Sequence, residues 1–283
     1  MKRLLITGGS GFLGGRIIKA YKDRYEILAP GHRELDITSE ASVTGFLQEY
    51  HPDIIIHCAA ISDVGRCEKE PELAHTINVT GSIHIARAAA AHGAKCILCS
   101  SDQVYFGSTL PGPHHEEEKL QPCNCYGQGK QEAENRCLDA NPDCVLLRLS
   151  WMDDTCTLHP SEHGDFIRTL LPKLQTGQPL HYPLHDRRGI TNVREVIRNL
   201  EQTFALPGGI YNFGAPNHQN TYETVRSAFL RAGLDSHRIQ PDTEAFAANP
   251  RDITMCQKKI NAHGIHFSST EQGLADVLGK LSI

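Results

Sequence analysis

The chain has 283 residues, a formal net charge of −5, 40% hydrophobic residues and 22% charged residues. That length can bury a sizeable core, and the mild negative charge without a basic stripe argues against a nucleic-acid partner. The first apolar run stops at Thr7, too short for a signal peptide, and no apolar stretch approaches the ~20 residues of a membrane span. We therefore expect a cytoplasmic globular protein with no membrane partner.

The first half of the chain alternates short apolar runs with helical patterns. Strands are expected at Lys2–Thr7, Tyr25–Ala29, Asp53–Cys58, in a run ending near Cys99, and at Cys144–Leu149. Helices are expected at Phe12–Lys22, at Glu40–Tyr50, from about Pro71 to His92, and from Tyr126. This alternation predicts an α/β fold of the Rossmann type, with a doubly wound parallel sheet and helices on both faces.

From Trp151 onward the pattern loosens into short helices between loops. Helices are expected at Asp165–Gln175, Val193–Phe204, Tyr222–Ala232 and Glu271–Lys280, and continuations of the sheet near Gln178–Tyr182 and Ile210–Phe213. We predict a dinucleotide-binding Rossmann domain at residues 1–150, to which residues of about 178–205 return. Residues 151–283 are expected to form mostly a small C-terminal α/β substrate-binding cap.

The ten cysteines are expected to be free thiols, because the chain shows no signal for secretion. Cys96 and Cys99 have the spacing of a redox or zinc motif, but they lie in an expected strand. Residues three apart on a strand point to opposite faces, so the two thiols cannot bind one ion there. We predict no metal site.

A glycine-rich segment, TGGSGFLG, lies between the first strand and the first helix at residues 7–14. Its glycines allow a tight turn, close approach of a pyrophosphate to the helix N-terminus, and close packing of helix on strand. At this place in a strand–turn–helix unit the pattern predicts dinucleotide binding. The predicted contacts are Gly8, Ser10, Gly11, Phe12, Leu13 and Gly14.

The end of the second strand bears on the choice of cofactor. An acidic residue there would bind the ribose hydroxyls of NAD, but residues 29–33 read APGHR. Arg33 can pair with a 2′-phosphate, which favours NADP(H) over NAD(H), unless it is only a solvated loop charge. Asp36 and Ile37 are expected to flank the adenine, and an N-cap role competes for Asp36.

Candidate reactive groups follow the fourth strand. Ser101 ends that strand, where doubly wound sheets bind ligands, and Tyr126 and Lys130 share one face of the next helix. An ammonium near the phenol would lower the pKa of Tyr126, which would make it a usable acid or base. Gly127 and Gly129 are expected to leave room for cofactor and substrate beside this pair.

These motifs together resemble the extended short-chain dehydrogenase/reductases. The relevant segments are TGGSGFLG, SSDQVY at residues 100–105, YGQGK at 126–130, the segment 55–81, LRLSW at 147–151 and RRGITNVREV at 187–196. Within that family the chain looks most like the dTDP-4-dehydrorhamnose reductases, over about the first 200 residues. The resemblance implies NADP(H), with NAD(H) possible, and a nucleotide-sugar substrate; it leaves a homodimer open.

The resemblance also assigns roles to single residues. Tyr126 would be the acid/base, Lys130 would hold the nicotinamide ribose, and Ser101 would position the carbonyl. The residues assigned to the cofactor by resemblance are Cys58, Ala59, Ala60 and Ser100, those near the sugar are Asp102 and Trp151, and Asn78 would support the fourth strand. For Trp151, the only tryptophan, a packing role is an equal alternative.

Departures from the family pattern limit what the resemblance implies about the substrate. Ser101 stands where the reductases usually have Thr, and it keeps the hydroxyl. Gln103 stands where related dehydratases have a carboxylate, so dehydration is disfavoured. Gly65 and Arg66 replace an Asp-Lys pair, which leaves the particular sugar open.

Three functions are consistent with these observations. The first is an NADPH-dependent reductase of the 4-keto group of a nucleotide-activated deoxysugar, with Tyr126 as proton donor. The second is an NAD-dependent sugar-nucleotide epimerase. The third is a non-catalytic NADP-binding regulatory subunit, as relatives resembling the beta subunit of methionine adenosyltransferase imply.

Overall fold

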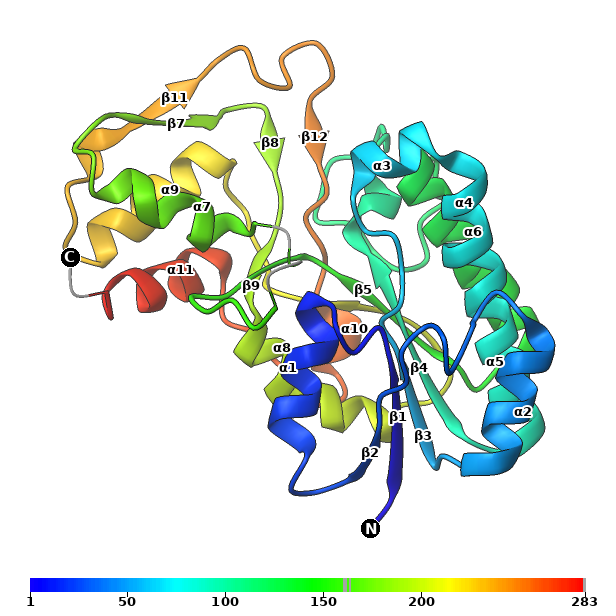
Figure 1. Cartoon of the computed structure of the whole chain (residues 1–283). Helices are drawn as coiled ribbons and strands as arrows, with labels where there is room; N and C mark the ends of the chain where they lie inside the picture. The colour runs from blue at the N-terminus through cyan, green and yellow to red at the C-terminus, as the bar shows by residue number, and fades with distance from the viewer. Residues whose placement is uncertain (160–161, 163, 282–283) are drawn as a thin grey trace.

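A computed structural model describes residues 1–159, 162 and 164–281. Its centre is a six-stranded parallel sheet in the spatial order β10-β5-β4-β3-β1-β2 (Figure 1). The strands are β1 (Arg3–Thr7), β2 (Glu26–Leu28), β3 (Ile54–His57), β4 (Lys95–Ser101), β5 (Val145–Leu149) and β10 (Gly209–Phe213). The strand order reverses between β1 and β3, and ligands of such sheets bind outside the carboxyl ends of the strands at this point.

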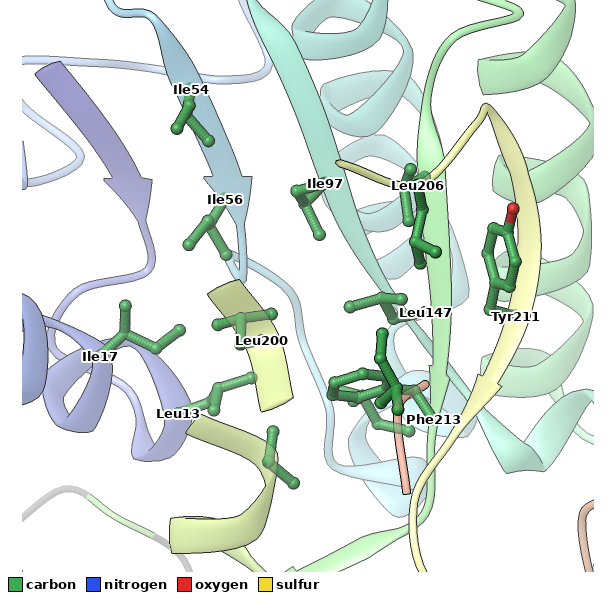
Figure 2. Close-up of a cluster of buried hydrophobic side chains, with 14 of the residues drawn as sticks. Leu13, Ile17, Ile54, Ile56, Ile97, Leu147, Leu200, Leu206, Tyr211 and Phe213 are labelled. Atoms are coloured by element: carbon green, nitrogen blue, oxygen red, sulfur yellow. The ribbon is translucent and has the colours of Figure 1, made fainter. Parts of the chain in front are cut away.

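Helices cover both faces of the sheet. One face carries α1 (Phe12–Tyr21), α8 (Val193–Leu200) and α10 (Lys258–Asn261), and the other carries α2 (Glu40–Tyr50), α5 (Gly81–His92) and α6 (Cys125–Ala140). Along β1, Leu4 and Ile6 join the core on the first face, whereas Leu5 joins the core on the second. Figure 2 shows the first of these cores. The predicted doubly wound sheet is confirmed.

The same alternation separates the two thiols with metal-like spacing. Cys96 is buried in the core of the second face, and Cys99 packs against the core of the first. Their expected divergence on β4 is confirmed.

The long helical segment expected from about Pro71 to His92 is confirmed. It consists of α4 (Pro71–His75), a π-helical turn (Thr76–Thr80) and α5. The short helix α3 (Val64–Lys69) was not expected, because a six-residue helix offers too little periodicity to recognise. Asp63 begins it by accepting a hydrogen bond from the Arg66 amide at 2.6 Å. Short 3₁₀ turns occur at Asp102–Tyr105, Glu201–Ala205 and Ser236–Arg238.

The cap is held by three pairs of short parallel strands. They are β6 (Trp151–Asp153) with β9 (Ile190–Asn192), β7 (Leu180–Pro183) with β11 (Ile239–Asp242), and β8 (Asp186–Arg187) with β12 (Arg251–Asp252). Its helices α7 (Phe166–Leu174), α9 (Thr221–Arg231) and α11 (Thr270–Leu278) pack around a separate apolar core.

One expected sheet continuation is wrong. The strand near 178–182 exists, but it pairs with β11 in the cap, where Leu180 and Ile239 join the cap core. The other continuation is confirmed, since β10 pairs with β5. The sequence of a short strand does not indicate which strand it pairs with. The pairing depends on which apolar core its buried side chains join.

Within the described ranges, no helix has both the length and the apolarity that crossing a membrane needs.

Candidate active site

The glycine-rich turn brings β1, α1 and the loop after β3 into close contact. Gly8 has a φ of +71°, and a Cβ added there would lie 2.7 Å from the amide nitrogen of Ala59. A Cβ on Gly14 would lie 2.3 Å from the carbonyl oxygen of Gly8. Gly11 begins α1, and its amide donates to the Gly8 carbonyl at 3.0 Å. Only glycine allows this cradle, which exposes a helix N-terminus of the kind that binds phosphates.

The other residues of the turn divide between surface and core. Ser10 is exposed beside Gly11. Leu13 is buried in the core of the first sheet face, so any ligand contact of Leu13 has to use its backbone. The ring of Phe12 lies under the guanidinium of Arg16, with 3.9 Å from Cζ to the ring centroid.

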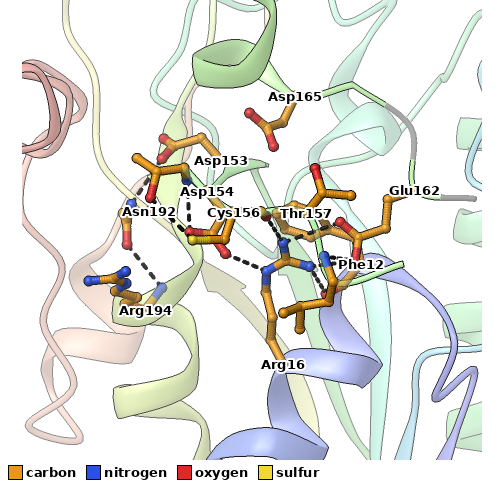
Figure 3. A network of polar contacts seen from close by, with 12 residues as sticks. Phe12, Arg16, Asp153, Asp154, Cys156, Thr157, Glu162, Asp165, Asn192 and Arg194 are labelled. Carbon is orange, nitrogen blue, oxygen red and sulfur yellow. Dashed lines mark hydrogen bonds and ion pairs between the residues drawn. The ribbon is translucent and has the colours of Figure 1, made fainter. Parts of the chain in front are cut away.

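Arg16 ties this turn to the cap (Figure 3). Its Nε donates to Asp154 Oδ2 at 2.6 Å, its Nη1 donates to Glu162 Oε1 at 2.9 Å, and its Nη2 donates to the Cys156 carbonyl. Arg16 is 5% exposed, so this is a buried charge with charged partners. Sequence reasoning missed it, because an arginine in a helix ordinarily indicates a solvated face and its partners lie more than 130 residues away.

The expected adenosine end lies beyond β2. Arg33 is exposed, and the nearby carboxylate of Glu34 accepts from the Gly31 amide at 2.8 Å. Asp36 accepts from the hydroxyl and the amide of Thr38, which lowers the pKa of this carboxyl. The N-cap alternative for Asp36 is wrong, because Ser39 caps α2.

Ile37 packs on α5. A Cβ added to Gly81 would lie 2.9 Å from Ile37 Cδ1, so this glycine makes room for the isoleucine.

The loop after β3 is pinned by Asn78. Its Nδ2 donates to the Ile61 carbonyl at 2.9 Å, and its Oδ1 accepts from the Ile61 amide at 2.7 Å. The expectation that Asn78 supports the fourth strand is therefore wrong. Cys58, Ala59 and Ala60 are partly exposed beside the glycine turn, and Cys58 Sγ lies 3.6 Å from Cys99 Sγ.

The predicted reactive groups come together at the carboxyl end of β4. Ser101 is the last residue of β4, and Tyr126 and Lys130 project from the first turns of α6. The Ser101 hydroxyl interacts with the Tyr126 phenol, and Lys130 Nζ donates to the Cys99 carbonyl at 2.8 Å. All three side chains are buried. The sequence prediction that they form one cluster agrees with this geometry.

The electrostatics differ from the expectation. Burial raises the pKa of Tyr126, the charge of Asp102 raises it further, and the Ser101 hydroxyl lowers it in part. Burial also lowers the pKa of Lys130, whose ammonium lies 5.7 Å from the centroid of the Tyr126 ring. The predicted lowering of the Tyr126 pKa by Lys130 is therefore wrong for the chain alone. Tyr126 is therefore a neutral phenol at physiological pH and a weaker acid than a solvent-exposed phenol.

The two glycines of YGQGK, Gly127 and Gly129, have different surroundings. A Cβ on Gly127 would lie 2.5 Å from the Gln103 carbonyl oxygen, so this position lets α6 pack on the 3₁₀ turn after β4. A Cβ on Gly129 would make only an ordinary contact, 3.7 Å from Val79. The expectation that Gly127 leaves room for ligands is wrong, because protein backbone occupies that side.

A buried ion pair connects β5 to α6, the helix that carries Tyr126 and Lys130. Arg148 on β5 donates to both carboxylate oxygens of Glu134 on α6, at 2.9 and 2.7 Å, and each residue is 1% exposed. Ser100 Oγ donates to Glu134 Oε1 at 2.6 Å. The Ser100 hydroxyl therefore belongs to this network, and a cofactor contact of Ser100 would have to use its backbone. In the sequence, the one signal of this ion pair is Arg148, a single arginine within the apolar run LRLSW.

The side facing the cap carries Asp102, Arg188 and Trp151. Arg188 Nη2 lies 3.9 Å from Asp102 Oδ2, and the Arg188 guanidinium stacks on Trp151, with 4.7 Å from Cζ to the ring centroid. Trp151 also packs edge-to-face on Phe166. Trp151 thus combines a packing role with a place near the site, and Arg188 was not anticipated.

Comparison with known proteins shows which family the chain belongs to. The family described as RmlD substrate binding domain matches residues 1–283. The dTDP-4-dehydrorhamnose reductase of Aggregatibacter actinomycetemcomitans is 36% identical over 174 residues, which cover 60% of this chain and 56% of that protein. Methionine adenosyltransferase 2 subunit beta of Xenopus laevis is 30% identical over 267 residues, covering 88% of this chain and 78% of that protein.

Among solved structures, the dTDP-4-dehydrorhamnose reductase of Bacillus anthracis in complex with NADP aligns with a TM-score of 0.83 at 26% identity. The alignment covers 97% of this chain and 98% of that one. The resemblance inferred from the motifs is confirmed: the chain belongs to the RmlD substrate-binding-domain family, with the fold of the extended short-chain dehydrogenase/reductases.

Proposed function

We propose that this protein is an NADPH-dependent reductase of the 4-keto group of a nucleotide-activated deoxysugar. The observation that carries the proposal is the cluster of Ser101, Tyr126 and Lys130 at the carboxyl end of β4. The glycine cradle after β1 and the loop after β3 lie at the same edge of the sheet. The family and the NADP-bound relative support the same assignment.

The residues present suit such a cofactor. The cradle at Gly8 and Gly14 excludes side chains at the N-terminus of α1, as a pyrophosphate requires. Arg33 is exposed beyond β2 and available to a 2′-phosphate. When bound, NADPH would supply the hydride. Lys130, held beside β4 by its bond to the Cys99 carbonyl, would bind the nicotinamide ribose.

The protein's own part in the reaction is to hold the ketone and protonate it. On substrate binding, Ser101 Oγ would turn its one proton from Asp102 Oδ1 to the ketone oxygen. Tyr126 would give its phenolic proton to the same oxygen as negative charge develops there. The raised pKa of Tyr126 makes the phenol a weaker acid, so the transfer would rely on the negative charge that develops on the ketone oxygen. Asp102 and Trp151 would contact the sugar.

The test is oxidation of NADPH with dTDP-activated 4-keto-6-deoxysugars, comparing wild type with Tyr126→Phe. Loss of the phenolic proton should lower kcat about 10²- to 10⁴-fold. Tyr50→Phe is the matched control, because Tyr50 is 37% exposed on α2. An NADP-induced rise in melting temperature of the same size in all three proteins would show intact folding and cofactor binding. Equal rates for wild type and Tyr126→Phe would contradict the assignment.

A regulatory role is the second candidate. The specific observation is the 30% identity to the methionine adenosyltransferase beta subunit over 88% of this chain. Stoichiometric capture of an enzyme partner together with NADP binding, and no turnover of any keto sugar by the wild type, would favour this role over the reductase.

A further inference from the structure

Two thiols meet at the carboxyl ends of two neighbouring strands. Cys58 directly follows β3, Cys99 lies near the end of β4, and their Sγ atoms are 3.6 Å apart. The strand register pairs His57 with Leu98, which places Cys58 opposite Cys99. Both are free thiols, and both pack against the core of the first sheet face. Their contact is therefore built into the parallel sheet.

The positions of the two residues suit a disulfide. Neighbouring strands lie about 4.8 Å apart, which is within the range of about 4.4–6.8 Å between the Cα atoms of a disulfide. The backbone holds both residues in place, since the Cys58 amide donates to the Thr7 carbonyl at 3.2 Å and Cys99 pairs with Leu147 on β5. The two sulfurs already touch, so a bond between them needs only a small further approach.

A second pair of thiols in the same sheet provides a contrast. Cys96 on β4 and Cys144 before β5 also hydrogen-bond through their thiols, in the core of the second face. They are 1% and 0% exposed, so the fold shields them from a dissolved oxidant. Cys58 and Cys99 are partly exposed, next to the loop that contacts the glycine turn. Of these two pairs, the one at the end of β3 and β4 combines contact with access.

The surroundings give the two thiols different roles. The pKa of Cys99 is lowered, chiefly by the hydrogen bond from Cys58 and further by the charge of Lys130, although burial opposes this change. The same hydrogen bond and burial raise the pKa of Cys58. A thiolate is the form that attacks a peroxide, and a second thiol nearby can then resolve the product to a disulfide. Cys99 is therefore the group expected to react first, with Cys58 as the resolving thiol.

We infer that Cys58 and Cys99 form a modification site, a dithiol that hydrogen peroxide oxidises to a disulfide, and that this oxidation weakens the binding of NADP(H). In the first step the Cys99 thiolate attacks one peroxide oxygen, so that an S–O bond forms and the O–O bond breaks. The leaving hydroxide takes up the proton that Cys99 had released and becomes water.

The second step forms the disulfide. Cys58 attacks the sulfenic sulfur of Cys99, so that the S–S bond forms and the S–O bond breaks. The second hydroxide leaves with the proton of Cys58 as water. Two thiols are thus oxidised to one disulfide, and one peroxide is reduced to two waters.

The backbone of each cysteine touches one part of the proposed cofactor site. A Cβ on Gly8 in the glycine cradle would lie 2.9 Å from the carbonyl carbon of Cys58, and the Cys99 carbonyl accepts from Lys130 Nζ at 2.8 Å. A covalent bond holds two sulfurs closer than their present contact, so oxidation draws the two strand ends together and displaces these neighbours. By linkage, bound NADP(H) favours the dithiol. The inference rests on the NADP(H) binding of the proposed function.

The test treats the wild type, without cofactor, with hydrogen peroxide and then measures NADP affinity from melting shifts. Mass spectrometry should find a peptide cross-linked through Cys58 and Cys99, with fragmentation to distinguish Cys99 from Cys96. The oxidised protein should bind NADP about tenfold or more weakly, which is within the usual range of coupling between two sites, and dithiothreitol should restore the affinity. NADP added before the peroxide should suppress the cross-link.

Cys58→Ser and Cys99→Ser should each lose the cross-link and the effect of peroxide on affinity, judged against the untreated sample of the same variant. Cys123→Ser is the matched control, since Cys123 is an exposed thiol outside the pair and its variant should keep both responses. A wild type without the cross-link, or one whose cross-link leaves NADP affinity unchanged, would overturn this inference alone. A reduced wild type without any NADP-induced melting shift would overturn the proposed function with it.

Discussion

The sheet half and the cap half of this chain differ in how far apart in the sequence their paired strands lie. In the central sheet, β1 pairs with β2 and β3, and β4 with β3 and β5, so most neighbours come from consecutive strand–helix units. In the cap, Trp151 pairs with Ile190 and Leu180 with Ile239. Local units are recognisable from sequence and form a regular scaffold, whereas distant pairings leave little local pattern.

The candidate site takes groups from both halves. The glycine cradle, Ser101, Tyr126 and Lys130 belong to the sheet half, and Arg188 and Trp151 come from the cap. The comparison predicts that changes in the sheet half impair cofactor binding and chemistry, while changes in the cap alter substrate choice or the stability of the cap itself.

The largest effect is expected in the glycine cradle. Gly8→Ala would combine a φ of +71° with a Cβ 2.7 Å from the Ala59 nitrogen. Gly93→Ala, at the end of α5, has a similar φ of +67° but no atom within 4 Å of the new Cβ. Gly93→Ala should cost about 1 kcal/mol in the free energy of unfolding from backbone strain alone, and Gly8→Ala about 3 kcal/mol or more.

Urea unfolding measures both variants, and NADP-induced melting shifts report the cofactor site. Only Gly8→Ala should lose the shift. Equal costs for the two variants, with the shift retained, would show that the cradle does not depend on a side-chain-free Gly8.

A pH-dependent effect of comparable size is expected in the cap. Burial raises the pKa of Asp153 on β6 to about 7, while the pKa of an unfolded aspartate is about 4. The folded state therefore binds the extra proton between these values, and its stabilisation is present at pH 4 and lost as the pH rises through 7. The loss amounts to at most about 4 kcal/mol.

Trp151, the only tryptophan, lies on the same strand and reports unfolding of the cap by fluorescence. The urea midpoint of the wild type should therefore fall between pH 5 and pH 8. Asp153→Asn keeps an oxygen that accepts from Asn192 Nδ2, and it should flatten this decline. Asp139→Asn, on the exposed surface of α6, should leave the decline unchanged. An unaltered decline in Asp153→Asn would assign the pH dependence to other groups.

The smallest effect concerns the choice of cofactor. Arg33→Ala should reduce the preference for NADPH over NADH about tenfold, which corresponds to one charge-assisted contact of about 1.4 kcal/mol. The ratio of kcat/KM for the two cofactors measures it. Arg226→Ala, on the exposed face of α9 in the cap, is the control. A preference unchanged by Arg33→Ala would mean that Arg33 is a solvated loop charge.

Much of the sheet half was predictable because its signals are local. The expected helix Glu40–Tyr50 agrees with α2 at both ends, and Ser101, Tyr126 and Lys130 were found from a strand end and an i, i+4 spacing. Apart from α3 and most of the short cap strands, which were not expected, the errors concern contacts. Asn78 binds the loop after β3, Gly127 packs on backbone, and the strand near 180 pairs within the cap. Each depends on a partner that sequence spacing does not specify.

By itself the sequence determined the alternating strands and helices, the glycine cradle and the Tyr-x-x-x-Lys face, because these follow from chain periodicity and from residue types that only certain turns accept. Tertiary structure alone decided where the buried charges pair. Arg16 reaches Asp154, Arg148 reaches Glu134, and Arg188 stops short of Asp102. These outcomes depend on burial and on distances of a few ångströms between segments that are far apart in the sequence, and sequence spacing does not specify them.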